Sequence, residues 1–196
     1  MKLLTKRWNS LSCSVVLIAA TCGTGCSSNT TLINERLDPV TSVTIRYSEH
    51  PLVFFRPVSG RSAFAKDYVD MAPVEINRSG NFRYYLWLGI STADGDATAR
   101  DEFESLVISA DDTELRLDIK RCTTMAIGAS QPVYSKPFST AVDAYCEVSV
   151  SQLRLLAEAA ELRVHTDGSD RLAFEPWDNQ ERGKAALLEF VNGPTY

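Results

Sequence analysis

Hydrophobic and polar residues alternate over most of the chain after residue 40, which is the pattern of half-buried β-strands. Val43, Ile45 and Tyr47, for example, alternate with polar neighbours. The run 51–57 has a proline at each end and therefore suits an edge strand. The pattern predicts strands over residues 41–48, 51–57, 68–69, 74–76, 82–92, 103–110, 113–120, 142–150, 162–165 and 172–174.

The strand predicted over residues 82–92 carries large apolar groups on both faces. Leu86 and Leu88 share one face, whereas Tyr85 and Trp87 share the other. One interpretation is a central strand that is covered on both sides. The alternative is that Tyr85 and Trp87 line an exposed groove for a partner or ligand, so these two residues are candidates for a binding surface.

Two helices are predicted near the C-terminus. Ser149 and Gln152 have the spacing of a capping box, and apolar residues follow at helical intervals from Leu153. A second helix is expected to start near Asp178 and to bury Ala185, Leu188 and Val191. The predicted fold class is therefore α+β, an antiparallel β-sheet or sandwich with two C-terminal helices packed on it.

Residues 123–140 do not fit this pattern, because Gly128, Pro132 and Pro137 interrupt them. Irregular segments of this length are unusual inside a compact domain and often carry function. We therefore expect a functional role for this segment.

The N-terminus has the composition of an export signal. Lys2, Lys6 and Arg7 precede an apolar stretch over residues 11–20 that is too short to span a bilayer. Gly23-Thr24-Gly25-Cys26 follows, and this tetrad resembles the lipobox of bacterial lipoproteins.

The resemblance implies that Cys26 is diacylated and becomes the mature N-terminus, with the acyl chains holding the protein on a membrane. Ser27 after that cysteine implies the periplasmic face of the outer membrane. Alternatives are acylation at Cys22, an ordinary cleaved secretory signal, or a buried helix over residues 1–25.

The predicted organisation is a signal peptide over residues 1–25, a lipidated N-terminus and flexible tether over 26–36, and one globular α+β domain over 37–196. The domain is similar in general appearance to uncharacterised exported envelope proteins of Gram-negative bacteria. Its Ser/Thr/Asn-rich start has few large apolar groups, which favours a short tether.

Charge excludes one class of partner. Removing residues 1–25 takes three of the 20 basic residues, which leaves 17 against 25 acidic residues and a net charge near −8. An acidic chain without a cluster of basic residues is not expected to bind nucleic acid.

Cys122 and Cys146 remain as an even pair, so we predict a disulfide if the strand before Cys122 ends near Lys120.

No catalytic, metal-binding or cofactor-binding motif is evident. The chain lacks a nucleophile elbow, its two histidines, His50 and His165, are isolated, and the acidic residues near Gly95 do not follow a calcium-loop spacing. We therefore predict no catalytic residues, no metal and no cofactor.

The sequence favours a membrane-anchored envelope lipoprotein that acts as a non-catalytic interaction or structural component, with an envelope protein as its partner. One alternative is a periplasmic binding module for a lipid or small amphiphile, which needs an enclosed apolar cavity. The other is a carboxylate-based hydrolase, which needs converging acidic residues.

Overall fold

The computed structural model describes residues 31–193 except 61, 63, 94, 96–102, 124–126, 137–140, 169–170 and 179. These residues confirm the predicted α+β class, because the chain is mostly antiparallel sheet with two helices. The strands are β1 (Ile33–Leu37), β2 (Thr44–Ser48), β3 (Leu52–Pro57), β4 (Lys66–Arg78), β5 (Asn81–Ser91), β6 (Ser105–Ala110), β7 (Thr113–Asp118), β8 (Val142–Val148), β9 (Leu162–Thr166) and β10 (Ala173–Pro176). The helices are the short 3-10 helix η2 (Ile119–Arg121), α1 (Val150–Glu158) and α2 (Glu181–Asn192).

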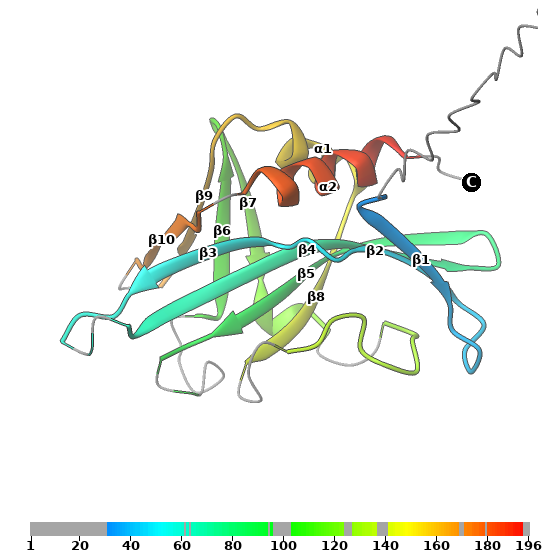
Figure 1. The fold of residues 1–196 in the computed structure, drawn as a ribbon, viewed down its shortest axis with the longest axis horizontal. Coiled ribbons are helices and arrows are strands. Elements are labelled where there is room, and N and C mark those ends of the chain that lie inside the picture. Colours follow the sequence, from blue (N-terminus) through cyan, green and yellow to red (C-terminus); the bar gives the residue numbers. More distant parts are fainter. Residues whose placement is uncertain are drawn as a thin grey trace, which may run out of the picture. The chain divides into compact units, whose positions relative to one another are not determined.

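The described strands form a single curled sheet that resembles half of a barrel. Its order is β1-β2-β4-β3-β10-β9-β6-β7, and β5 joins the other edge of β4 and pairs with β8. Both α1 and α2 lie on the same side of this sheet (Figure 1). We call that side the helix face and the opposite side of β2, β4, β5 and β8 the outer face.

β4 is one long strand, whereas the sequence predicted two short strands separated by Pro73. It is 13 residues long and passes straight through this proline. β3 pairs with β4 as far as Met71, and β2 takes over at Val74, so Pro73 falls where β4 changes partner. A proline is tolerated there because the ladder requires no N–H from that residue.

The ordered sheet also begins earlier than predicted. Residues 33–36, which were expected to belong to the tether, form β1 with Leu37 and pair in register with β2. The Arg36 guanidinium lies over the Tyr47 ring and donates to the Pro132 carbonyl. Cross-strand pairing and these contacts define the strand, although its sequence contains little apolar surface.

Helix α1 confirms the predicted capping box, with Ser149 and Gln152 bonded reciprocally. The predicted buried face of α2 is correct only at Val191, because Ala185 and Leu188 are exposed while Ala186, Leu187 and Phe190 are buried. The helix also begins slightly later than predicted, at Glu181 rather than near Asp178. Neither α-helix in the described chain has the length and apolar composition needed to cross a bilayer.

Large apolar side chains fill the layer between the helix face and the two helices. The buried members include Phe54, Met71, Leu86, Leu88, Ile90, Leu106, Ile108, Leu153, Leu156, Leu187 and Phe190. This cluster is the main core of the domain, and its burial is the largest favourable contribution to folding.

Candidate functional site

The outer face carries a second apolar cluster, which the irregular segment 127–136 covers. Its buried members are Val43, Ile45, Ala72, Val74, Ile76, Tyr85, Trp87, Ile127, Ala129 and Tyr145. The structure thus favours the covered-strand interpretation of β5, with apolar groups packed on both faces. Tyr85 and Trp87 are 7% and 3% exposed, so they do not form an open apolar surface.

Trp87 is held by two specific contacts. Its indole stacks on Tyr134 with ring centroids 4.3 Å apart, and its Nε1 donates to the Asp143 carboxylate. Tyr134 in turn donates its hydroxyl to the Pro73 carbonyl, 3.2 Å away. Trp87 therefore anchors segment 127–136 to the sheet and lies below it.

Asp38 fixes the same segment from the other side. Its carboxylate accepts hydrogen bonds from the Ser130 backbone N–H and from the Ser130 hydroxyl, the latter at 2.9 Å. The Ser130 N–H is the main reason that the pKa of Asp38 lies well below its usual range. These contacts show how a segment without helix or strand keeps a defined position.

Two carboxylates flank Gly89 on the outer face. Gly89 pairs with Asp70 on β4 and with Asp143 on β8, and the Trp87 ring occupies the space that a Cβ at Gly89 would need. Burial raises the pKa of Asp70 to about 6 and also raises that of Asp143. Neither carboxylate lines the pocket described below.

We expect Asp70→Asn to change how stability depends on pH. The folded protein keeps the Asp70 proton up to about pH 6, whereas the unfolded chain loses it near pH 3.8. Between these pH values the folded state therefore binds more protons than the unfolded state. As the pH rises through this window, the free energy of unfolding of the wild type should therefore fall by about 2 kcal/mol relative to that of the variant. Urea unfolding at pH 4 and pH 7.5 measures this, and parallel pH profiles for the two proteins would contradict it.

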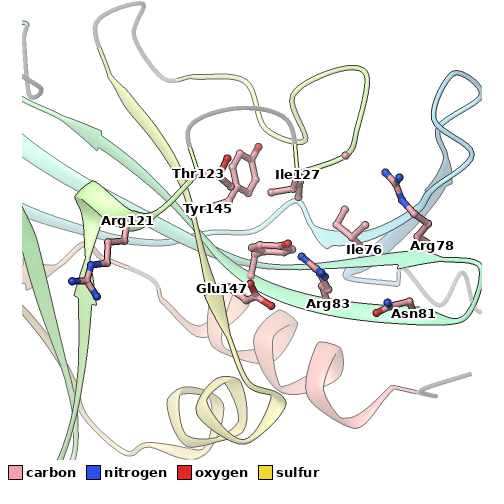
Figure 2. A pocket seen from close by; sticks show the side chains of 11 residues that line it. Ile76, Arg78, Asn81, Arg83, Arg121, Thr123, Ile127, Tyr145 and Glu147 are labelled. Atoms are coloured by element: carbon pink, nitrogen blue, oxygen red, sulfur yellow. The ribbon is translucent and has the colours of Figure 1, made fainter.

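An open pocket of about 530 Å³ adjoins the second apolar cluster, where the β4–β5 hairpin faces segment 127–136 and β8 (Figure 2). We call it the hairpin pocket. It is lined by Ile76, Arg78, Asn81, Arg83, Tyr85, Arg121, Thr123, Ile127, Gly128, Tyr145 and Glu147. Its volume lies within the range of small-molecule sites.

The lining is more basic than the chain as a whole, because it contains three arginines and one glutamate while the full sequence has a net charge of −5. Arg121 forms an ion pair with Asp118 at 3.0 Å and points away from the other labelled side chains (Figure 2). Within the described part of the chain, Arg78 and Arg83 have no such ion pair. These two arginines supply the accessible positive charge.

The predicted disulfide between Cys122 and Cys146 is confirmed and lies at the edge of the pocket. β7 ends at Asp118, so the strand alternation that would have turned Cys122 away from β8 stops before it. All four sequence neighbours of the two cysteines line the pocket: Arg121, Thr123, Tyr145 and Glu147. Thr123 and Tyr145 also exchange two backbone hydrogen bonds, of 2.8 and 3.1 Å.

Gly128 lies close to the end of the Arg78 side chain and has a left-handed backbone that favours glycine. Its φ is +85°, and an added Cβ would lie 2.6 Å from the Arg78 Nη2. The close approach restricts the positions available to the guanidinium.

Gly128→Ala is therefore expected to be more destabilising than Gly80→Ala. Both positions have a similar positive φ, but a Cβ at Gly80 meets nothing within 4 Å. Each variant should lose about 1 kcal/mol through the left-handed backbone, and only Gly128→Ala must also displace Arg78. Chemical denaturation of both variants measures the difference, and equal losses would show that the Arg78 contact has no effect.

The remaining sequence candidates lie elsewhere. Cys26 and most of the acidic stretch after Gly95 are outside the described residues. His165 is buried and uses both ring nitrogens: Nε2 accepts from Arg171, and Nδ1 faces the Thr166 carbonyl at 3.0 Å. His50 lies in the turn between β2 and β3, where its backbone N–H bonds to Ser48.

A smaller pocket of about 370 Å³ lies where β3 and β10 meet the start of α2. Leu52, Phe54 and Trp177 contribute apolar surface to it, and Lys184 and Glu161 contribute charges. It lies at the edge of the main core, because the layer between sheet and helices is filled by side chains.

The fold and the site define an antiparallel half-barrel domain with an open, arginine-lined pocket on its outer face. Comparison with models of known protein families, with curated proteins and with solved structures gives no match.

Proposed function

We propose that this protein is a non-catalytic interaction component of a bacterial cell envelope, anchored to the membrane by acyl chains on Cys26. The Gly23-Thr24-Gly25-Cys26 tetrad after a short apolar stretch supports the anchor. Ser27 favours the periplasmic face of the outer membrane. An envelope protein or envelope molecule is the expected partner of the domain.

The disulfide is the observation that best supports this proposal. Structural disulfides persist in oxidising compartments such as the periplasm and are rare in the cytosol. Cys122 and Cys146 are bonded across 24 residues, between the end of η2 and β8. Export to such a compartment is what the N-terminal pattern independently predicts.

The hairpin pocket supports an interaction role. It is open, it combines charged groups with aromatic and aliphatic walls, and segment 127–136 holds its rim in place through Trp87 and Asp38. A site with these properties is suited to recognition of a partner group. Among its lining residues, no pair has the arrangement of a nucleophile and its histidine base.

A lipid- or amphiphile-binding role is the second candidate. In the part of the chain that the structure describes, the layer between sheet and helices holds no enclosed cavity for an acyl chain, so the support for this role is limited to the edge pocket at α2, where Trp177 is 38% exposed above the buried Leu52 and Phe54. Trp177→Ala should weaken amphiphile binding if this pocket is used.

Replacement of Cys26 tests the anchor. We expect Cys26→Ser to remove the acyl chains and to release the protein from the membrane fraction, because the acyl chains on Cys26 are the whole of the proposed membrane attachment. Cys22→Ser is the matched control and should leave attachment unchanged. Membrane fractionation and metabolic labelling with palmitate measure both, and an acylated, membrane-bound Cys26→Ser protein would refute the proposal.

Crosslinking in intact cells tests the interaction role. The proposal predicts reproducible crosslinks between the domain and an envelope component, identified by mass spectrometry. A domain that yields no crosslinks while the anchor is intact would contradict an interaction role and leave only the localisation.

A further inference from the structure

We infer that the hairpin pocket binds an oxyanion, a phosphate or carboxylate group, between Arg78 and Arg83. This inference deepens the proposed interaction role and rests on it, because it names the chemistry that the pocket recognises. It does not depend on acylation of Cys26.

The β4–β5 hairpin places the two arginines on one face and close together. Arg83 pairs directly with Ile76, and Arg78 lies two residues beyond Ile76 on the same face of β4. Such diagonal neighbours are about 7–8 Å apart, which is within the joint reach of two long side chains. One oxyanion can therefore accept hydrogen bonds from both guanidinium groups.

The charge arrangement also favours a counterion. Two guanidinium groups at neighbouring positions repel each other, and neither has an ion-pair partner among the described residues. An oxyanion between them replaces this repulsion with two favourable contacts. Arginine is well suited to the task, because its planar fork matches the geometry of carboxylate and phosphate.

The rest of the pocket adds neutral groups. Asn81 provides an exposed amide, whereas Tyr145 is only 2% exposed and its hydroxyl already accepts a hydrogen bond from the Val133 N–H at 3.3 Å. Ile76 and Ile127 form an apolar wall (Figure 2). This wall suits an oxyanion that is carried on a larger body, such as a phosphorylated sugar or a lipid headgroup.

Glu147 acts against anion binding and provides a sensitive test. It lies on β8 opposite Tyr85, and its carboxylate borders the same pocket as Arg83 (Figure 2). A negative charge there weakens the attraction for an oxyanion. Its removal should therefore strengthen binding, an outcome that loss of folding cannot imitate.

The experiment is calorimetric titration of the full-length protein in a non-ionic detergent. Glucose 6-phosphate is the soluble probe and glucose its neutral control. Phosphatidylglycerol in mixed micelles with the same detergent is the lipid probe, and phosphatidylcholine in such micelles is its control. We expect at least one anionic probe to bind and both neutral controls to fail. The probe that binds identifies whether the oxyanion comes from a soluble molecule or from a lipid headgroup.

Matched variants assign the binding to the pocket. Arg83→Gln and Arg78→Gln should each weaken it about tenfold or more, since each removes a charge-assisted hydrogen bond. Glu147→Gln should tighten binding several-fold. Arg163 on β9 is exposed and forms an ion pair with Glu161, and Arg163→Gln should have no effect on binding. Melting temperatures equal to that of the wild type establish that each variant folds.

Two results would overturn the inference: no binding of either anionic probe, or binding that Arg78→Gln and Arg83→Gln leave unchanged. Either result, obtained with a protein that is still anchored and crosslinked in cells, contradicts oxyanion recognition and leaves the proposed function standing. Release of the Cys26-intact protein from membranes, or absence of crosslinks, contradicts the proposed function instead.

Discussion

Arg46→Met is expected to destabilise the folded protein by about 3–5 kcal/mol, because it leaves the buried Glu75 carboxylate without its counterion. Arg46 and Glu75 are directly paired between β2 and β4, are 9% and 7% exposed, and approach to 3.4 Å. Burial already raises the pKa of Glu75, and the Arg46 charge opposes that rise. Without the guanidinium, the carboxylate must either ionise at high cost or take up a proton.

Arg46 also connects the sheet to α2. Its Nη2 donates to the Phe190 carbonyl at 2.8 Å, and its guanidinium carbon lies 4.5 Å from the centre of the Phe190 ring. Methionine retains much of the aliphatic stem but none of these donors. The C-terminal end of α2 should therefore lose protection from hydrogen exchange in the same variant.

Urea denaturation of three variants, each compared with the wild type, tests the Arg46 prediction. The double variant Arg46→Met/Glu75→Gln should recover part of the lost stability, since it removes the unpaired charge as well. Arg163→Met is the control, because it breaks an exposed pair with Glu161 and should change stability little. A loss below about 1 kcal/mol for Arg46→Met would mean that the pair does not hold α2 on the sheet.

Removal of the disulfide is expected to cost about 3 kcal/mol, which is the loop-closure estimate for cysteines 24 residues apart. The double variant Cys122→Ser/Cys146→Ser should show this loss in urea unfolding. Adding a reductant should lower the stability of the wild type by a similar amount and should not affect the double variant.

The same change should loosen the hairpin pocket. Arg121 and Thr123 are held near Tyr145 and Glu147 by the disulfide and by the Thr123–Tyr145 backbone bridge. Hydrogen exchange at residues 121–123 should therefore increase when the bond is absent. If exchange there and overall stability are both unchanged, the bond makes no contribution to the folded domain.

Local signals explain which elements the sequence predicted correctly. The capping box at Ser149 and Gln152, the two-faced apolar pattern of β5 and the hairpin of β9 and β10 all depend on residues that are close in sequence. Their propensities and periodicities agree with the final structure, so no distant contact overrides them. The cysteine pair was also predictable, because Cys122 and Cys146 are the even pair that follows the predicted signal and Cys26.

Distant contacts explain the elements that the sequence predicted wrongly. β4 continues through Pro73 only because β2 and β3 divide its edge between them. β1 forms because it pairs with β2, and α2 turns Phe190 inward because Arg46 and the sheet lie there. None of these partners is visible in the local pattern.

The hairpin pocket was not predictable for the same reason. Its walls come from the β4–β5 hairpin, from the residues around Cys122 and Gly128, and from β8, which are far apart in the chain. Arg78 and Arg83 each look like an ordinary surface arginine at the end of a strand. The interruption of residues 123–140 pointed to this region, since Ile127 and Gly128 line the pocket and segment 127–136 covers the outer face, but a functional role for the segment stays a prediction.

The most direct test of the proposed function is the intact mass of the protein extracted from the membranes of its own cells. The proposal predicts a chain that begins at Cys26 and carries the additional mass of acyl chains on its first residue. The mass should also lack two hydrogen atoms, because Cys122 and Cys146 are joined by a disulfide. A mass that corresponds to an unacylated chain, or to one that retains residues 1–25, would contradict the lipid anchor.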